Sequence, residues 1–317
     1  MAFKVATANR SGGCGKTTTL TSIAALANND MLEWIKQGWT IRGRKPRILI
    51  IDLDGQCDSS YYLGVADPDS LCMVCGERFD DELEPKERQP EDMCDGGRWH
   101  EPIPNIMDVL SADTSIREAI RATNLELVDL LPGTKHLEAA EKNLASATGA
   151  EFRLMDAVAE IEDEYDLILF DSPASYGLIA VNIFMATDDV IACVKAGMKE
   201  IRALVHLEHT IKQINTKLKH RVRPRATKIV AVLVTDAPGS VNHGKAYQDA
   251  VNFARDEYGE LVVTPVTRDV RVIEAYSARQ PVPLYDPSSN AAKAFGKVYP
   301  ELIGKGVLPS QRTAAGV

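Results

Sequence analysis

A glycine-rich stretch near the N-terminus has the residue types and spacing of a phosphate-binding loop. Residues 9–19 read Asn-Arg-Ser-Gly-Gly-Cys-Gly-Lys-Thr-Thr-Thr, between an apolar run at 3–8 and a helical pattern at 17–28. Glycines let backbone N–H groups approach phosphate oxygens, and a helix N-terminus adds partial positive charge. Lys16 would supply a point charge for the β- and γ-phosphates, and the Thr17 hydroxyl suits Mg²⁺. The alternative is a glycine turn that only caps a core helix, but loop, Lys-Thr pair and flanking elements agree on phosphate binding.

Two apolar runs further along the chain end in carboxylates. The run at 47–54 ends in Asp52 and Asp54, and the run at 165–170 is followed by Asp171. A continuous apolar run suits a buried parallel strand whose carboxyl end reaches a site. A carboxylate there can hold Mg²⁺ or position a water molecule in line with the γ-phosphorus. The alternative for each carboxylate is simple capping of a strand end or a following helix.

Strands and helices alternate along the chain. Strands are expected at 3–8, 47–54, 125–131, 165–170, 189–194 and 228–235, and helices at 17–28, 105–121, 134–147, 151–163, 176–186, 199–214 and after 291. This pattern predicts an α/β fold, a doubly wound, mostly parallel sheet flanked by helices, with ligand at the carboxyl ends of the strands. We expect one domain from residues 1–64 and 105–303, an inserted surface segment at 65–104 and a flexible tail at 304–317.

Four separate motifs resemble the ParA/MinD family of P-loop ATPases. The run from Ser11 resembles the family's deviant Walker A loop K-G-G-x-G-K-S/T, whereas the first glycine of the general loop would fall at Arg10. Residues 52–60 resemble the family's D-x-D-P-Q-G-N/S stretch, 171–174 its D-x-P-P, and 265–287 its block from I-P-R-N-V-R to Y-D-P. The resemblance implies an ATPase that dimerises with ATP and partitions or positions DNA or another cargo.

The same resemblance implies ATP and Mg²⁺ as ligands and assigns residues to them. It places the nucleotide at Ser11, Gly12, Gly13, Cys14, Gly15, Lys16, Thr17, Thr18 and Pro265. It makes Lys16 and Asp54 catalytic, with Asp54 orienting the attacking water, and gives Mg²⁺ to Thr17, Asp52 and Asp171. It further implies slow hydrolysis of ATP to ADP and phosphate until a ParB-like or adaptor protein stimulates it.

The chain departs from the family pattern at one charged position. The family's first loop lysine, which reaches the ATP of the partner subunit, is replaced by Ser11. Lys195, Lys199 and Arg10 are candidates to replace it, although each could be an ordinary surface charge. Ser11 and the enlarged middle segment resemble the carboxysome-positioning McdA-type branch, but plasmid partition proteins vary here too, so the branch stays open.

The inserted segment contains cysteines with metal-ligand spacing. From residue 77 to 95 it carries nine acidic and three basic residues, a composition that buries little surface. Cys72, Cys75, Cys94 and His100 follow the spacing C-x₂-C-x₁₈-C-x₅-H, which approximates a structural Zn²⁺ site. The alternatives are reduced thiols in a loop, or an iron–sulfur carrier ATPase of the same fold with Cys72 and Cys75 as ligands.

One strongly basic run stands out in an acidic protein. The net charge is −9, yet residues 212–228 hold seven Lys or Arg and no carboxylate. Such a surface suits salt-dependent, sequence-independent binding to double-stranded DNA, and the alternative is a solvated helix end that favours cations. Together with two arginines implied by the resemblance, the predicted DNA contacts are Lys219, Arg221, Arg223, Arg225, Arg268 and Arg271.

Composition indicates a cytoplasmic protein, and the DNA binding implied by the resemblance would make it nucleoid-associated. No apolar run approaches the roughly 18 residues of a membrane span, and the first strand begins almost at Met1, so no signal peptide is expected. Six scattered cysteines favour a reduced cytosol over a disulfide framework. The C-terminal tail lacks a basic amphipathic membrane anchor, which disfavours a membrane-bound division-site regulator.

Overall fold

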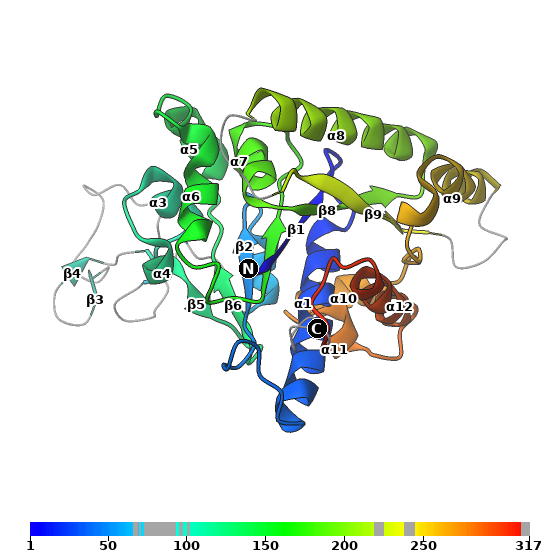
Figure 1. Cartoon of the computed structure of the whole chain (residues 1–317), viewed down its shortest axis with the longest axis horizontal. Coiled ribbons are helices and arrows are strands. Elements are labelled where there is room, and N and C mark those ends of the chain that lie inside the picture. The colour runs from blue at the N-terminus through cyan, green and yellow to red at the C-terminus, as the bar shows by residue number, and fades with distance from the viewer. Residues whose placement is uncertain are drawn as a thin grey trace.

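The fold is organised around a twisted, mostly parallel sheet (Figure 1). The computed structural model describes residues 1–65, 69, 71–72, 93–94, 98–99, 102–218, 225–237 and 245–311. Within them a seven-stranded sheet has the order β5-β6-β2-β7-β1-β8-β9, with only β5 antiparallel to its neighbour. The strands are β1 (Phe3–Ala8), β2 (Ile48–Asp52), β5 (Arg121–Ala122), β6 (Val128–Leu131), β7 (Leu167–Asp171), β8 (Asp189–Lys195) and β9 (Lys228–Thr235). The predicted fold class is confirmed.

Helices cover both faces of the sheet. They are α1 (Lys16–Lys36), α2 (Asp58–Tyr62), α3 (Ile106–Ser111), α4 (Ile116–Ala119), α5 (Leu137–Leu144), α6 (Arg153–Ala159), α7 (Leu178–Ala186), α8 (Met198–Lys217), α9 (Lys245–Tyr258), α10 (Arg271–Ser277), α11 (Val282–Tyr285) and α12 (Asn290–Gly304). Figure 1 shows α5–α8 on one face and α1 with α10–α12 on the other. In the described part of the chain no helix is long and apolar enough to cross a membrane.

Each strand of the sheet except the two-residue β5 contributes to two separate apolar cores. Along β2, Leu49 and Ile51 pack under α3 and α5–α8, whereas Ile48 and Ile50 pack under α1 and α12. Successive side chains of a strand point to opposite faces, so a strand buried on both faces must be apolar throughout. This is why these strands read as continuous apolar runs rather than alternating ones.

Several helix boundaries differ from the sequence prediction. The helix expected at 105–121 is broken between α3 and α4, because Ala112 adopts a left-handed conformation (φ 65°) and Ser115 caps α4. α1 continues past Asn28 to Lys36, since the Asn28 side chain is buried and accepts a hydrogen bond from Leu127 N at 3.0 Å. α9 was not predicted.

The parts expected to form one domain contribute to one sheet. β1 and β2 come from residues 1–64, and β5 to β9 come from residues 105–303. After α9 the chain runs parallel beside β9, through bridges from Val232 to Val262 and from Ala237 to Thr267. Two short strands, β3 (Met93–Cys94) and β4 (Arg98–Trp99), pair with each other within the expected insertion.

Candidate nucleotide-binding site

The loop between β1 and α1 is shaped by two glycines with left-handed backbone. Gly13 has φ 65° and Gly15 has φ 79°, values that residues with a side chain adopt only at a cost. A Cβ at Gly15 would also lie 3.2 Å from Thr235 Cγ2. The Lys16 amine bends back and donates to Ser11 O at 3.3 Å. The loop is therefore a tight cradle that opens the first turn of α1 to a ligand.

Two hydrogen bonds from neighbouring elements anchor this cradle. The Asn9 side chain donates to Cys193 O on β8 at 2.7 Å, and both residues are fully buried. Thr235, the last residue of β9, donates from its hydroxyl to Cys14 O at 2.9 Å. The loop is thus attached to β8 and β9, which line up beside β1 in the sheet.

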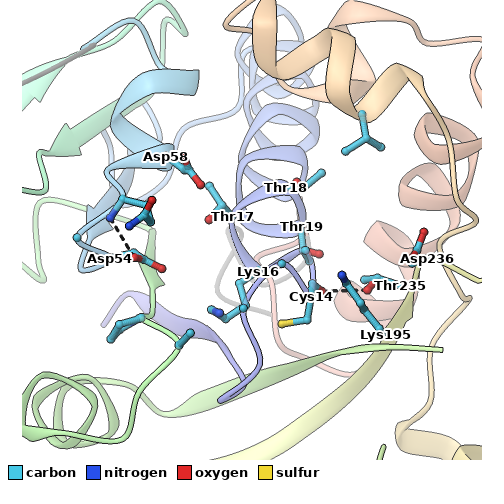
Figure 2. Close-up of a pocket in the computed structure, with 18 of the residues that line it drawn as sticks. Cys14, Lys16, Thr17, Thr18, Thr19, Asp54, Asp58, Lys195, Thr235 and Asp236 are labelled. Carbon is cyan, nitrogen blue, oxygen red and sulfur yellow. Dashed lines mark hydrogen bonds between the residues drawn. The ribbon is translucent and has the colours of Figure 1, made fainter. Parts of the chain in front are cut away.

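A cavity of about 990 Å³ lies over the loop at the carboxyl ends of the strands. Its wall comes from residues 12–19 of the loop and α1, 54–58 after β2, 135–141 around α5, 173–179 before α7, Lys195, 235–236 after β9, 266–273 before and in α10, and Phe295. Figure 2 shows Lys16 and Thr17 at the start of α1 and Asp54 beyond β2 facing the same space. This volume lies within the range of small-molecule and cofactor sites.

Asp171 at the end of β7 is hydrogen-bonded to the loop threonine. Its Oδ2 accepts from Thr17 Oγ1 at 2.7 Å and from Ser59 Oγ at 2.7 Å. Its Oδ1 is buried and has no hydrogen-bond partner among the described residues. Burial raises the pKa of this carboxyl, and the Ser59 and Thr17 hydroxyls act against that rise. One buried acceptor atom is therefore available to a ligand beside Thr17.

Asp52 at the end of β2 lies directly beside Asp171 in the parallel pairing of β2 with β7. It is fully buried and accepts from Ser60 N at 2.9 Å and from Ser60 Oγ at 2.7 Å. Burial and the neighbouring Asp171 carboxylate raise its pKa. The backbone of Gly133 packs on it so closely that a Cβ there would lie 3.0 Å from Asp52 Cγ.

These groups fit a hard divalent cation. The donor set is one hydroxyl and two carboxylates, the oxygen ligands that Mg²⁺ prefers, and the buried Oδ1 of Asp171 lacks a partner in the part of the chain that the structure describes. Mg²⁺ keeps several waters and takes only one or two carboxylates plus phosphate oxygens, so Thr17, Asp171 and Asp52 suffice. Among the described residues no cluster of three His, Cys, Asp or Glu forms a different metal site.

Asp54 differs from the two buried aspartates. It is partly exposed in the turn after β2 and lines the cavity. Its Oδ1 accepts from Gln56 N at 3.1 Å, which holds the carboxylate over the cavity. A carboxylate in this position can accept a proton or a hydrogen bond from a water molecule in the cavity.

Comparison with known proteins identifies the family. A family model described as an AAA domain matches residues 3–223, which include the loop and both strand-end aspartates. The chain belongs to the ParA/MinD type of P-loop ATPase. Family membership supports nucleotide hydrolysis, and this type of ATPase acts in partitioning or positioning.

Two curated relatives of this ATPase align over nearly its whole length. The sporulation initiation inhibitor protein Soj of Bacillus subtilis is 26% identical over 95% of this chain and 98% of its own. The chromosome partitioning protein ParA of Myxococcus xanthus is 26% identical over 96% and 89%.

Two solved structures share the fold. Apo McdA from Cyanothece superposes with a TM-score of 0.71 at 17% identity, covering 95% of this chain and 100% of that chain. Cobyrinic acid a,c-diamide synthase from Mycobacterium smegmatis, with a bound ATP analogue and magnesium, gives 0.64 at 23%, covering 96% and 95%.

The three candidates for the missing loop lysine occupy different positions in this ATPase. Lys195 is partly buried and lines the cavity. Lys199 and Arg10 are exposed and do not line it. Of the three, only Lys195 lines the cavity; Arg10 belongs to the loop itself but is exposed.

The predicted DNA contacts within the described residues do not gather at one place. Three lie outside the described residues: Lys219, Arg221 and Arg223. Arg225 is exposed just before β9, whereas Arg268 and Arg271 follow the segment that ends beside the end of β9. The eight residues of β9, about 26 Å in length, lie between Arg225 and the segment that carries Arg268 and Arg271. Arg268 pairs with Asp236 at 3.4 Å, and Arg271 pairs with Glu274 and Asp286.

The predicted zinc ligands are only partly described. Cys72 is buried, and its backbone bridges to Pro102. Cys75 and His100 lie outside the described residues, and only the backbone of Cys94 is described. The comparisons and the described residues do not support zinc. The structure also gives no support to the iron–sulfur alternative, because Cys72, one of its two proposed ligands, does not line the cavity.

Some site residues were not found from the sequence. Ser59 and Ser60 hold the buried aspartates, Gly133 packs on Asp52, and Thr235 anchors the loop. The serines end the stretch 52–60 that contains the predicted Asp52 and Asp54, so their position in the chain was a usable signal. Gly133 follows β6 and Thr235 ends β9, and only the three-dimensional pairing of the strands brings these two residues to the site. Val266 rather than the predicted Pro265 lines the cavity.

Proposed function

We propose that this protein hydrolyses ATP to ADP and phosphate, dimerises with ATP, and uses the cycle to partition or position DNA or another cargo. The observation that carries the proposal is the 2.7 Å contact between Thr17 Oγ1 and Asp171 Oδ2 at the start of α1. It joins the loop to the carboxylate pair at the strand ends. The names of the relatives Soj and ParA, and the magnesium and ATP analogue bound in the synthase, support it.

The chain's own groups account for nucleotide binding. Backbone N–H groups of residues 12–18 and the Lys16 amine would bind the phosphates. Thr17, Asp171 and Asp52 would hold Mg²⁺, which neutralises charge on the β- and γ-phosphates when bound. The left-handed Gly13 and Gly15 keep the loop open to these oxygens. Ser11, Cys14 and Thr18 belong to the same cradle.

Asp54 would position the attacking water. Phosphoryl transfer needs mainly positioning and electrostatic stabilisation, so a carboxylate that orients water can limit the rate. Asp54 lines the cavity and is partly exposed, unlike Asp52 and Asp171. Its role therefore differs from that of the two buried carboxylates.

The rim of the cavity suits a second subunit. Val270 and Ile273, at the start of α10, line the cavity and are 61% and 69% exposed. Exposed apolar residues beside a binding site favour contact with another protein surface. DNA would bind the basic residues after α8 and the arginines near α10, and a ParB-like or adaptor protein would stimulate hydrolysis.

Turnover of ATP tests the enzymatic part. The wild type should release phosphate from ATP only with Mg²⁺. Asp54→Ala should still bind ATP but lose turnover, by about 100-fold for a positioned water-orienting group. Asp113→Ala, which removes an exposed carboxylate between α3 and α4, is the matched control. No phosphate release by the wild type, or full turnover by Asp54→Ala, contradicts the assignment.

Binding to nonspecific duplex DNA tests the cargo part. It should be measured at one low salt concentration with ATP, with ADP and without nucleotide, because phosphate contacts weaken steeply with salt. If the protein binds DNA only with ATP, the result supports DNA binding that is controlled by the bound nucleotide. If the protein binds no DNA in any of the three states, the proposal that it acts on DNA is contradicted. The remaining proposal is an ATP-dependent protein that binds other proteins.

A further inference from the structure

The amine of Lys195 lies against the nucleotide loop of its own subunit. We propose that Lys195 acts in cis: it binds the polyphosphate chain of the nucleotide held in its own loop. It thereby places there a second positive charge, which Ser11 cannot supply. This inference rests on the proposed ATP binding and names a further ligand for that site.

The position of Lys195 follows from the sheet. It is the last residue of β8, which pairs with β1 on one side and β9 on the other. Beyond it, Ala196 N donates to Thr235 O at 3.0 Å and Gly197 N donates to Lys195 O at 2.7 Å. The backbone that carries the lysine is thus fixed at both ends of this turn.

The side chain reaches the loop. A Cβ built at Gly13 would lie 3.5 Å from Lys195 Nζ and 3.9 Å from its Cε. Figure 2 shows the Lys195 side chain rising from the end of β8 beside Cys14, with the Lys16 amine on the other side of the loop. The two amines therefore flank the backbone that would wrap the phosphates.

The charge on Lys195 lacks a counter-ion within the described residues. No carboxylate lies within 4.0 Å of its Nζ there, and no hydrogen bond is formed by it. Burial raises the pKa of the Cys14 thiol, and Lys16 and Lys195 both oppose that rise, which reflects their closeness to the loop. A partly buried, unpaired cation beside a phosphate cradle is complementary to an anionic ligand.

Three variants measure the effect on nucleotide binding. Lys195→Gln removes the charge and should weaken ADP and ATP binding about 10- to 100-fold, the range for one charge-assisted hydrogen bond. Lys195→Arg keeps a cation and should recover part of this loss. Lys297→Gln, an exposed lysine on α12, is the matched control and should bind like the wild type. Because Lys195 acts in cis, the loss should not depend on protein concentration.

A mixing experiment separates cis from trans action. At an ATP concentration well below the dissociation constant of Lys195→Gln, this variant should lack turnover because it binds too little ATP, and Asp54→Ala should lack turnover because it cannot position water. If Lys195 acts in cis, an equal mixture stays inactive, because each subunit has a defect in its own site. Recovery of turnover in the mixture, or unchanged nucleotide affinity in Lys195→Gln, overturns the inference. Failure of the proposed function would look different, since the wild type itself would neither bind nor hydrolyse ATP.

Discussion

Replacing Gly133 by alanine tests how closely the chain packs around the buried carboxylate of Asp52. Gly133 lies outside the left-handed backbone region, so the added methyl group introduces no backbone strain. It would instead lie 3.0 Å from Asp52 Cγ and 3.2 Å from each carboxylate oxygen. Its only effect is therefore to fill space that Asp52 already occupies.

The expected magnitude follows from these distances. Carbon atoms prefer separations of about 3.5–4.0 Å, so the Asp52 side chain or the Gly133 backbone must move by about 0.5–1 Å. Overpacking of this kind costs about 1–3 kcal/mol. The carboxylate is held by two hydrogen bonds from Ser60, and losing one of them adds about 1.5–3 kcal/mol. We expect Gly133→Ala to lower the free energy of unfolding by about 2.5–6 kcal/mol when one hydrogen bond is lost with the overpacking.

Urea unfolding of the whole chain measures this difference. Gly296→Ala is the matched control, because Gly296 lies inside α12 with no atom within 4 Å of the new Cβ. Alanine is favoured over glycine in a helix, so the control should gain about 0.5–1 kcal/mol. Mg²⁺-dependent nucleotide binding should weaken only in Gly133→Ala. Equal unfolding free energies for both variants would refute the argument that Gly133 confines Asp52.

Three further substitutions follow from single contacts. Ser59→Ala removes one hydroxyl donor to the buried Asp171 and should cost about 1.5–3 kcal/mol in urea unfolding, whereas a loss below 0.5 kcal/mol would contradict this. Arg44→Ala leaves Asp166, 3% exposed, without its double ion pair and should cost about 3–5 kcal/mol. Lys36→Ala breaks an exposed pair as its control and should cost at most about 0.5 kcal/mol; equal losses would refute the distinction. Tyr276→Phe removes the 2.8 Å bond to Asp58 but keeps the ring stacked on Tyr61, so it should cost about 0.5–1.5 kcal/mol and less than Tyr276→Ala.

Local patterns predicted the strands better than the helices. The bounds of β9 agree with the prediction, because its last six residues are buried and a strand buried on both faces reads as a nearly continuous apolar run. The same rule located Asp52 and Asp171 at strand ends. Helix boundaries depended on single residues instead: Ala112 in a left-handed conformation separates α3 from α4. The burial of Asn28 against Leu127 let α1 continue.

Long-range pairing limited what could be predicted of the site. β7 inserts between β2 and β1, so Asp171 becomes the direct neighbour of Asp52, although 119 positions separate them in the sequence. No local pattern determines that order. The same applies to Gly133 and Thr235, whose neighbours in the site come from β2 and from the loop. Ser59 and Ser60 lie inside the recognised stretch 52–60 and were overlooked although a local signal existed, whereas Gly133 and Thr235 reach the site only through the three-dimensional pairing and had no such signal.

The strand order also divides the site by charge. β2 and β7 lie on one side of β1 and end in Asp52 and Asp171, whereas β8 and β9 lie on the other side and end in Lys195 and Thr235. A nucleotide bound over β1 would have Asp52 and Asp171, and the Mg²⁺ that they would hold, on one side. Lys195 would lie on the opposite side of the loop. If both sides contribute, Asp171→Asn should weaken binding only in the presence of Mg²⁺. Lys195→Gln should weaken binding equally with and without Mg²⁺, since a lysine needs no metal to bind phosphate.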